Sequence, residues 1–187
     1  MSEPASAHHP LITLDEAIPL IDSVAYVARD AIVAGHVELL DQANIWYQCV
    51  LRGDFEFIRV GARSNLQDRV VVHTSDGCPV EIGSDVTVGH GAMIHGCTLQ
   101  DRCLVGMGAI VLDSAVVETG AVVAAGAVVP PGKRLTGSHV WAGNPARPLR
   151  ATTDADLAMI AESALEYVRL SSRHARAGGL LLLSLRS

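Results

Sequence analysis

The chain has 187 residues, of which 49% are hydrophobic and 4% aromatic, and this composition is sufficient for one domain with a sizeable core. Its formal charge of −6 at pH 7, without a run of Lys or Arg, argues against surfaces that bind nucleic acid or anionic membranes. No apolar stretch approaches the roughly 18 residues of a membrane span and no secretory leader is evident, so we expect a cytoplasmic protein. The four cysteines form no CxxC pair, which predicts reduced thiols.

Residues 1–22 show no repeat and are predicted to form an N-terminal arm. From Val27 onward an apolar residue recurs at every sixth position, and the series restarts after steps of nine, ten and five. A small or β-branched residue follows four positions later in most of these hexads. The apolar positions are Val27, Val33, Leu39, Ile45, Leu51, Val60, Leu66, Val72, Ile82, Val88, Ile94, Leu99, Val105, Val111, Val117, Val123 and Val129.

Hexads of this kind predict an all-β domain over residues 23–133. Three hexads complete one triangular coil whose sides are short parallel strands, with the apolar position pointing into the prism. A narrow prism leaves little room for rings, which accounts for the low aromatic content. Cys49 and Cys103 occupy small-residue positions, so we expect them to pack in the core. The period itself does not determine the hand of the coil.

The repeat ends at the prolines of "PPGKRL", and residues 134–153 are predicted to be a connecting loop. Residues 154–176 are predicted to form an α-helix because apolar residues recur at helical spacing. We expect that apolar face to pack along the prism or on an adjacent subunit. In the tail, residues 177–187, the short apolar run at 180–184 should pack on the body or on a neighbour. The predicted helix face comprises Leu157, Ile160, Ala161, Ala164, Leu165 and Val168.

The repeat predicts how three histidines lie relative to one another. The hexads that start at 72 and 94 lie on the same side of the prism one turn apart, so His73 and His95 should stack about 4.8 Å apart, with Arg52 in the same column. His90 belongs to a different side and would meet this pair only if identical prisms stood around a threefold axis. Such an arrangement predicts a metal site between subunits. The other histidines are expected to be solvated surface residues: His8, His9, His36, His139 and His174.

The stretches "IWYQCVLRGD", "GARSNLQDRVVVH" and "VGHGAMIHGC" resemble the gamma-class carbonic anhydrase family of the short-loop bacterial type. The resemblance covers about residues 20 to 170. It implies a left-handed parallel β-helix with a C-terminal α-helix, assembled as a homotrimer with metal ions at the subunit interfaces. It also implies reversible hydration of CO₂ to bicarbonate, in which hydroxide on the metal attacks CO₂.

Position by position, the resemblance assigns His73, His90 and His95 as metal ligands. Three imidazoles suit Zn²⁺ with one open position, and they also suit Fe²⁺ or Co²⁺. Gln67 matches a residue beside the metal-bound water, Asn65 lies in the same motif, and Tyr167 resembles a helix tyrosine near the metal. The remaining matches form a charged cluster that ties subunits together near the site, and they are Arg52, Asp54 and Asp68.

The sequence departs from the family's best-known active form, which carries a long acidic loop with a proton-accepting glutamate. Here "DFEFIR" and "TSDGCPVE" are short, and Glu56, Asp76 and Glu81 are candidates among which the sequence does not choose. Two other functions stay open at this point. A hexapeptide acyltransferase would use one histidine as a general base toward an acyl-CoA. A metal-binding trimeric scaffold of low or no activity would also fit the shortened loops.

Overall fold

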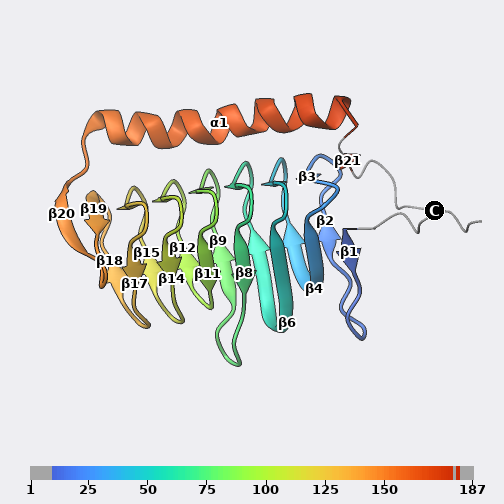
Figure 1. Cartoon of the computed structure of the whole chain (residues 1–187), viewed down its shortest axis with the longest axis horizontal. Helices are drawn as coiled ribbons and strands as arrows, with labels where there is room; N and C mark the ends of the chain where they lie inside the picture. The colour runs from blue at the N-terminus through green and yellow to red at the C-terminus, as the bar shows by residue number, and fades with distance from the viewer. Residues whose placement is uncertain (1–9, 179, 182–187) are drawn as a thin grey trace, which may run out of the picture.

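The computed structural model describes residues 10–178 and 180–181. His8, His9 and the rest of the arm before Pro10, like most of the apolar run at 180–184, lie outside the described residues. The described chain winds into a parallel β-helix of triangular cross-section, with one long helix lying along its length (Figure 1). The predicted architecture is therefore the observed one.

The prism has three faces, which we number in the order in which the chain visits them. Two long strands, β4 (Ile32–Leu39) and β6 (Val50–Val60), bend around one corner, so that their first halves belong to face 1 and their second halves to face 2. Face 1 also holds β1 (Leu11–Ile12), β8 (Val71–His73), β11 (Met93–His95), β14 (Ile110–Val111) and β17 (Val128–Val129). Face 2 also holds β2 (Leu20–Ile21), β9 (Val80–Ile82), β12 (Thr98–Leu99), β15 (Val116–Val117) and β18 (Arg134–Leu135).

Face 3 forms a separate sheet of parallel strands with one antiparallel strand at each edge. Its parallel strands are β3 (Tyr26–Val27), β5 (Asn44–Ile45), β7 (Asn65–Leu66), β10 (Thr87–Val88), β13 (Leu104–Val105), β16 (Val122–Val123) and β19 (His139–Ala142). The antiparallel strands are β20 (Arg147–Ala151), beside β19, and β21 (Leu180–Leu181), beside β3. The start of the tail thus pairs with the body, as expected.

The interior of the prism consists of the residues that the hexad pattern selects. Each of the predicted inward positions is buried, with at most 2% of its surface exposed. Cys49 and Cys103 are buried beside them as free thiols, and burial raises the pKa of the Cys49 thiol to about 12. Both cysteines are therefore core residues and not nucleophiles.

The β-helix extends beyond residues 23–133 at both ends. Strands β1 and β2 pair in parallel with β4, so part of the predicted arm is the first coil of the prism. The predicted loop at 134–153 contains β18, β19 and β20. At the C-terminal end Leu135 and Trp141 continue the six-residue step from Val129 and are buried, so β18 and β19 extend the prism in register. Strand β20 pairs antiparallel with β19 and so provides partners for backbone groups at the edge of face 3.

Helix α1 (Asp154–Arg176) occupies the predicted range and lies over face 3 (Figure 1). It begins with a capping box in which Thr153 and Asp156 satisfy each other's backbone N–H groups. The predicted apolar face is correct only in part: Ile160 and Ala164 are buried, whereas Leu157 and Leu165 are about half exposed, because a straight helix meets a flat sheet along a narrow strip. No helix in the described part of the chain has the length and apolar character needed to cross a bilayer.

An aromatic cluster holds the C-terminal half of α1 against the prism. The ring of Trp46, directly after β5, stands edge-on to those of Tyr167 and His174, with centroid distances of 5.3 and 5.0 Å. The Tyr47 hydroxyl lies 2.8 Å from Nδ1 of His174. The expectation that His174 is a solvated surface residue is therefore wrong, because it is part of this contact.

Candidate metal centre

His73 and His95 lie next to each other on face 1. They are paired residues on the neighbouring strands β8 and β11, and Arg52 on β6 is paired with His73 on its other side. Nδ1 of His73 and Nε2 of His95 are 3.1 Å apart. The stacked column predicted from the repeat is thus present.

Each of these two imidazoles is in contact with a carboxylate. Nε2 of His73 lies 3.0 Å from Oδ1 of Asp54, whose other oxygen accepts a hydrogen bond from Arg52. Nδ1 of His95 lies 2.5 Å from Oδ1 of Asp113. Partial burial acts to raise the pKa of Asp54, but the hydrogen bonds from Arg52 and His73 outweigh it, so that the pKa lies below the ordinary value.

This donor set suits a cation. When His73 and His95 each donate an N–H to their carboxylate, the two nitrogens that face each other present lone pairs at 3.1 Å, an arrangement that a cation between them would stabilise. Two imidazole nitrogens on a tetrahedral Zn²⁺ would be about 3.3 Å apart, given Zn–N bonds of about 2.05 Å. Carboxylates behind ligating histidines are a regular feature of metal sites.

His90 does not join this pair within the chain. It lies in the corner after β10, between faces 3 and 1, where Nδ1 is 2.8 Å from Oδ2 of Asp68. The imidazole is 38% exposed, and its Nε2 is left for another partner. Within the described residues no three His, Cys, Asp or Glu side chains are close enough to hold a metal ion. A single chain thus carries a pair of adjacent imidazoles and a separate third histidine, as the coil arithmetic predicts.

Gln67 and Asn65 belong to the half of the site that carries His90. The Gln67 amide oxygen accepts a hydrogen bond from the backbone N–H of His90 at 3.3 Å, and its Nε2 donates to Oδ1 of Asn65 at 3.3 Å. Asn65 in turn donates to the Thr87 hydroxyl at 2.9 Å, and Thr87 lies 3.1 Å from the hydroxyl of Ser163 on α1. Gln67 is therefore held by a buried polar network that begins under the helix.

The structure distributes the other predicted residues between these two halves. Arg52 and Asp54 lie beside His73, whereas Asp68 lies beside His90, so the predicted charged cluster is divided within one chain. Tyr167 also lies on the His90 side, where burial and then the charge of Asp68 raise its pKa.

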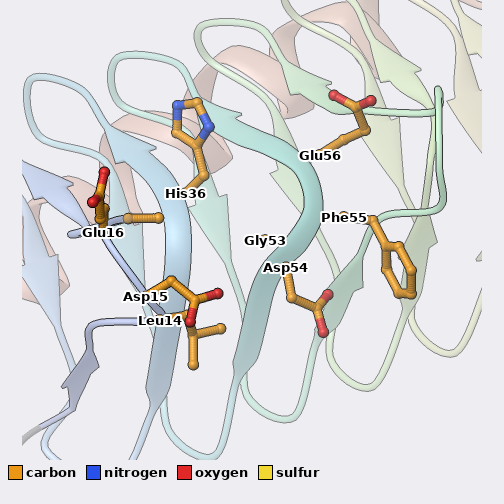
Figure 2. A pocket seen from close by; sticks show the side chains of 9 residues that line it. Leu14, Asp15, Glu16, His36, Gly53, Asp54, Phe55 and Glu56 are labelled. Carbon is orange, nitrogen blue, oxygen red and sulfur yellow. The ribbon is translucent and has the colours of Figure 1, made fainter.

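An open groove of about 590 Å³ adjoins the His73 half of the site (Figure 2). Asp15, Glu16 and His36 line one side of it, and the segment from Gly53 to Glu56 lines the other, with Asp54 shared between the groove and His73. His36 is exposed, as expected of a solvated surface residue, and it lines this groove. Of the three carboxylates considered for proton transfer, Glu56 lines the groove, Asp76 is exposed, and Glu81 lies on face 2.

Two residues of this region are not selected by the sequence analysis. Phe55 is 62% exposed, and its ring stands edge-on to His73 with a centroid distance of 5.9 Å. Asp113 contacts His95, and the repeat gives a partial signal for it: Ile94 is paired with Val111, so Asp113 lies one residue beyond the position one coil after His95. For Phe55 no signal exists, because it lies in an insertion that interrupts the repeat.

The chain is similar to proteins named as carbonic anhydrases. It is 43% identical over 179 residues to gamma carbonic anhydrase 1, mitochondrial, of Arabidopsis thaliana, a match that covers 92% of this chain and 65% of the relative. The chain thus spans about 65% of the length of that plant relative. It is 45% identical over 152 residues to a probable carbonic anhydrase of Methanocaldococcus jannaschii, covering 81% of this chain and 96% of that protein. No model of a known protein family matches the chain.

Solved structures share the fold over most of its length. A hexapeptide transferase family protein from Anaplasma phagocytophilum superposes with a TM-score of 0.86 at 41% identity, covering 88% of this chain and 98% of that one. A putative acetyltransferase from Bacillus cereus gives a TM-score of 0.88 at 32% identity, with coverages of 89% and 97%. The fold is therefore the left-handed parallel β-helix of hexapeptide repeats with a C-terminal helix that the resemblance implies.

Proposed function

The chain belongs to the gamma carbonic anhydrase family, and on that premise we propose that it catalyses the reversible hydration of CO₂ to bicarbonate. The observation that carries the proposal is the pair of opposed imidazole nitrogens on face 1, each ring backed by a carboxylate. In this proposal His73 and His95 bind a Zn²⁺ ion together with His90 of the partner subunit, and Fe²⁺ or Co²⁺ would suit the same ligands. A bound Zn²⁺ acts as a Lewis acid that makes water nucleophilic near neutral pH.

The proposed assembly is a homotrimer in which face 1 of each chain meets the His90 corner of the next. An outward column of apolar side chains runs along face 1 beside the histidines, and Ile32 and Met93 in it are 36% and 40% exposed. Face 2 instead carries charges such as Glu38 and Arg59, and face 3 is covered by α1. Face 1 is therefore the face that gains most from burial. The apolar column comprises Ile32, Val50, Val71, Met93, Ile110 and Val128.

Gln67 is proposed to orient the reacting oxygen atoms. Its amide is fixed on one side by Asn65 and on the other by the backbone of His90, so its position follows that of the third ligand. A preorganised hydrogen-bonding group lowers the barrier because it needs no reorientation during the reaction. Arg52 and Asp54 hold His73 and are assigned a structural role at the interface.

Metal analysis and CO₂-hydration kinetics of the purified protein test the proposal together. We expect about one ion per chain and hydration activity that requires the ion. His95→Ala should lose both metal and activity, whereas the matched control His139→Ala, on face 3, should retain both. Metal-free protein that binds coenzyme A would favour the acyltransferase alternative suggested by the names of the two structural relatives. Metal-loaded trimers without hydration activity would leave the scaffold alternative.

A further inference from the structure

We propose that Asp113 is a positioning residue for the metal centre, which keeps the proton of His95 on Nδ1 and turns Nε2 toward His73. The inference rests on the proposed function in so far as it assumes that these histidines bind a metal ion. Asp113 lies in the corner that follows β14, on the coil after that of His95 and two residues beyond Val111, the partner of Ile94. Its carboxylate thereby approaches the imidazole from the side opposite to His73.

Both oxygens of Asp113 have partners, and these come from different parts of the chain. Oδ1 lies 2.5 Å from Nδ1 of His95. Oδ2 accepts a hydrogen bond of 3.2 Å from the hydroxyl of Ser75, in the turn between β8 and β9. The carboxylate is 36% exposed and the imidazole 26%, so the contact is partly shielded from water. Two partners fix the plane of the carboxylate, and the carboxylate in turn fixes the ring.

The residue after His95, Gly96, leaves space for this carboxylate. Gly96 has a φ of +52°, and a Cβ built on it would lie 2.5 Å from Oδ1 of Asp113 and 2.9 Å from Cβ of Cys78. Its N–H donates to the carbonyl of His73 at 3.0 Å, and its carbonyl accepts from the N–H of Ser114 at 2.6 Å. A side chain at position 96 would therefore displace Asp113, and glycine leaves the space free.

The tautomer of His95 decides what the two rings can bind. A proton on Nδ1 leaves a lone pair on Nε2, opposite the lone pair on Nδ1 of His73, and a metal ion fits between them. Without Asp113 the proton of His95 is free to move to Nε2. The rings would then join by a hydrogen bond across the same 3.1 Å, and this hydrogen bond would compete with the ion.

The test compares Asp113→Ala and Asp113→Asn with the wild-type protein, and Asp101→Ala serves as the matched control. Asp101 is also a corner carboxylate, but its partner is the backbone N–H of Ser84. Zn²⁺ affinity is measured by competition with a chromophoric chelator, and the thermal stability of the metal-free proteins is measured in parallel. We expect Asp113→Ala to weaken Zn²⁺ binding about 10- to 100-fold, and Asp113→Asn to weaken it less because its amide oxygen still accepts a hydrogen bond.

The competing explanation is a purely structural role for Asp113. In that case the metal-free Asp113→Ala protein would be less stable than wild type while its Zn²⁺ affinity stayed at the wild-type value, and the proposal would be overturned. Equal weakening in Asp101→Ala would overturn it as well. If Asp113→Ala does not fold, wild-type affinity in Asp113→Asn decides against the proposal. Failure of the proposed function is a separate result, since wild-type protein would then show no CO₂ hydration whatever the variants bind.

Discussion

Mixing two inactive variants tests whether each metal site is divided between two chains. His90→Ala chains keep the His73 and His95 pair, and His95→Ala chains keep His90. Each variant alone should bind metal poorly, because two protein ligands hold an ion weakly. A site that lies between subunits is rebuilt wherever a His90→Ala chain presents its intact pair to the intact His90 of a His95→Ala chain.

The expected amount of rebuilt site follows from the geometry of a ring of three identical interfaces. Going around any trimer that contains both variants, the required order of neighbours occurs once, so each mixed trimer regains about one of its three sites. Equal expression with random assembly restores about one quarter of all sites. A site contained in one chain gives no restoration at any mixing ratio.

The assay uses a different affinity tag on each variant, so that only trimers containing both are isolated. Metal content by atomic emission should then approach about one ion per trimer, against about three in the wild type, with hydration activity in proportion. Trimers of each variant alone, purified in the same way, give the baseline metal content. Mixed trimers with no more metal than these baselines would refute the interface site and the assignment of His90 to the neighbouring pair.

Three further predictions address the other parts of the structure. Gln67→Ala should leave the metal bound but lower kcat in stopped-flow hydration, and loss of the ion itself would assign Gln67 a different role. Ile94→Ala, at a fully buried inward residue that precedes His95 and is paired with Val72, should lower the free energy of unfolding in urea by about 2–5 kcal/mol. The pKa of Asp156 is lowered by Arg150 and by Thr153, so its stabilisation is present above about pH 4 and is lost as pH falls toward the folded-state pKa. Asp156→Asn should therefore lower the free energy of unfolding at pH 7. Below about pH 4 the free energy of unfolding of this variant should fall less steeply with pH than that of the wild type, as measured by urea unfolding at several pH values.

The interior of the prism and the stacking of His73 on His95 could be predicted because both follow from one period. A hexad fixes which side chains point inward, and three hexads fix which residues are neighbours one coil later. The insertions that interrupt the period leave this prediction intact. A step of nine or ten residues lengthens a corner of the prism and does not shift the strands on its faces. Asp113 was only partly available from the same arithmetic, since it lies in a corner, one residue beyond the position one coil after His95.

Most of the parts that the sequence analysis did not predict lie where the period gives no information. Strands β18 and β19 are the exception, because Leu135 and Trp141 continue the six-residue step from Val129. Strand β20 pairs with β19 through backbone groups, which place few demands on the side chains. The contact of His174 with Tyr47 joins residues more than a hundred positions apart, and a helical pattern alone does not show what the helix meets. The groove beside Asp54 is lined by the turn between β1 and β2 and by the insertion at residues 53–56, whose conformations follow no repeat.

The division of the histidines between two faces has a geometric cause. Residues in one column of a parallel sheet are separated by about 4.8 Å per strand, and those two strands apart by about 9.6 Å. Imidazole nitrogens about 2 Å from one ion can therefore come from adjacent strands. In this column the next place holds Arg52 and no histidine, and its guanidinium orients Asp54. In the proposed site the column thus supplies two imidazoles, and the third comes from another surface. His90, in a corner with Nε2 directed away from its own carboxylate partner, has the placement that a neighbouring chain can use.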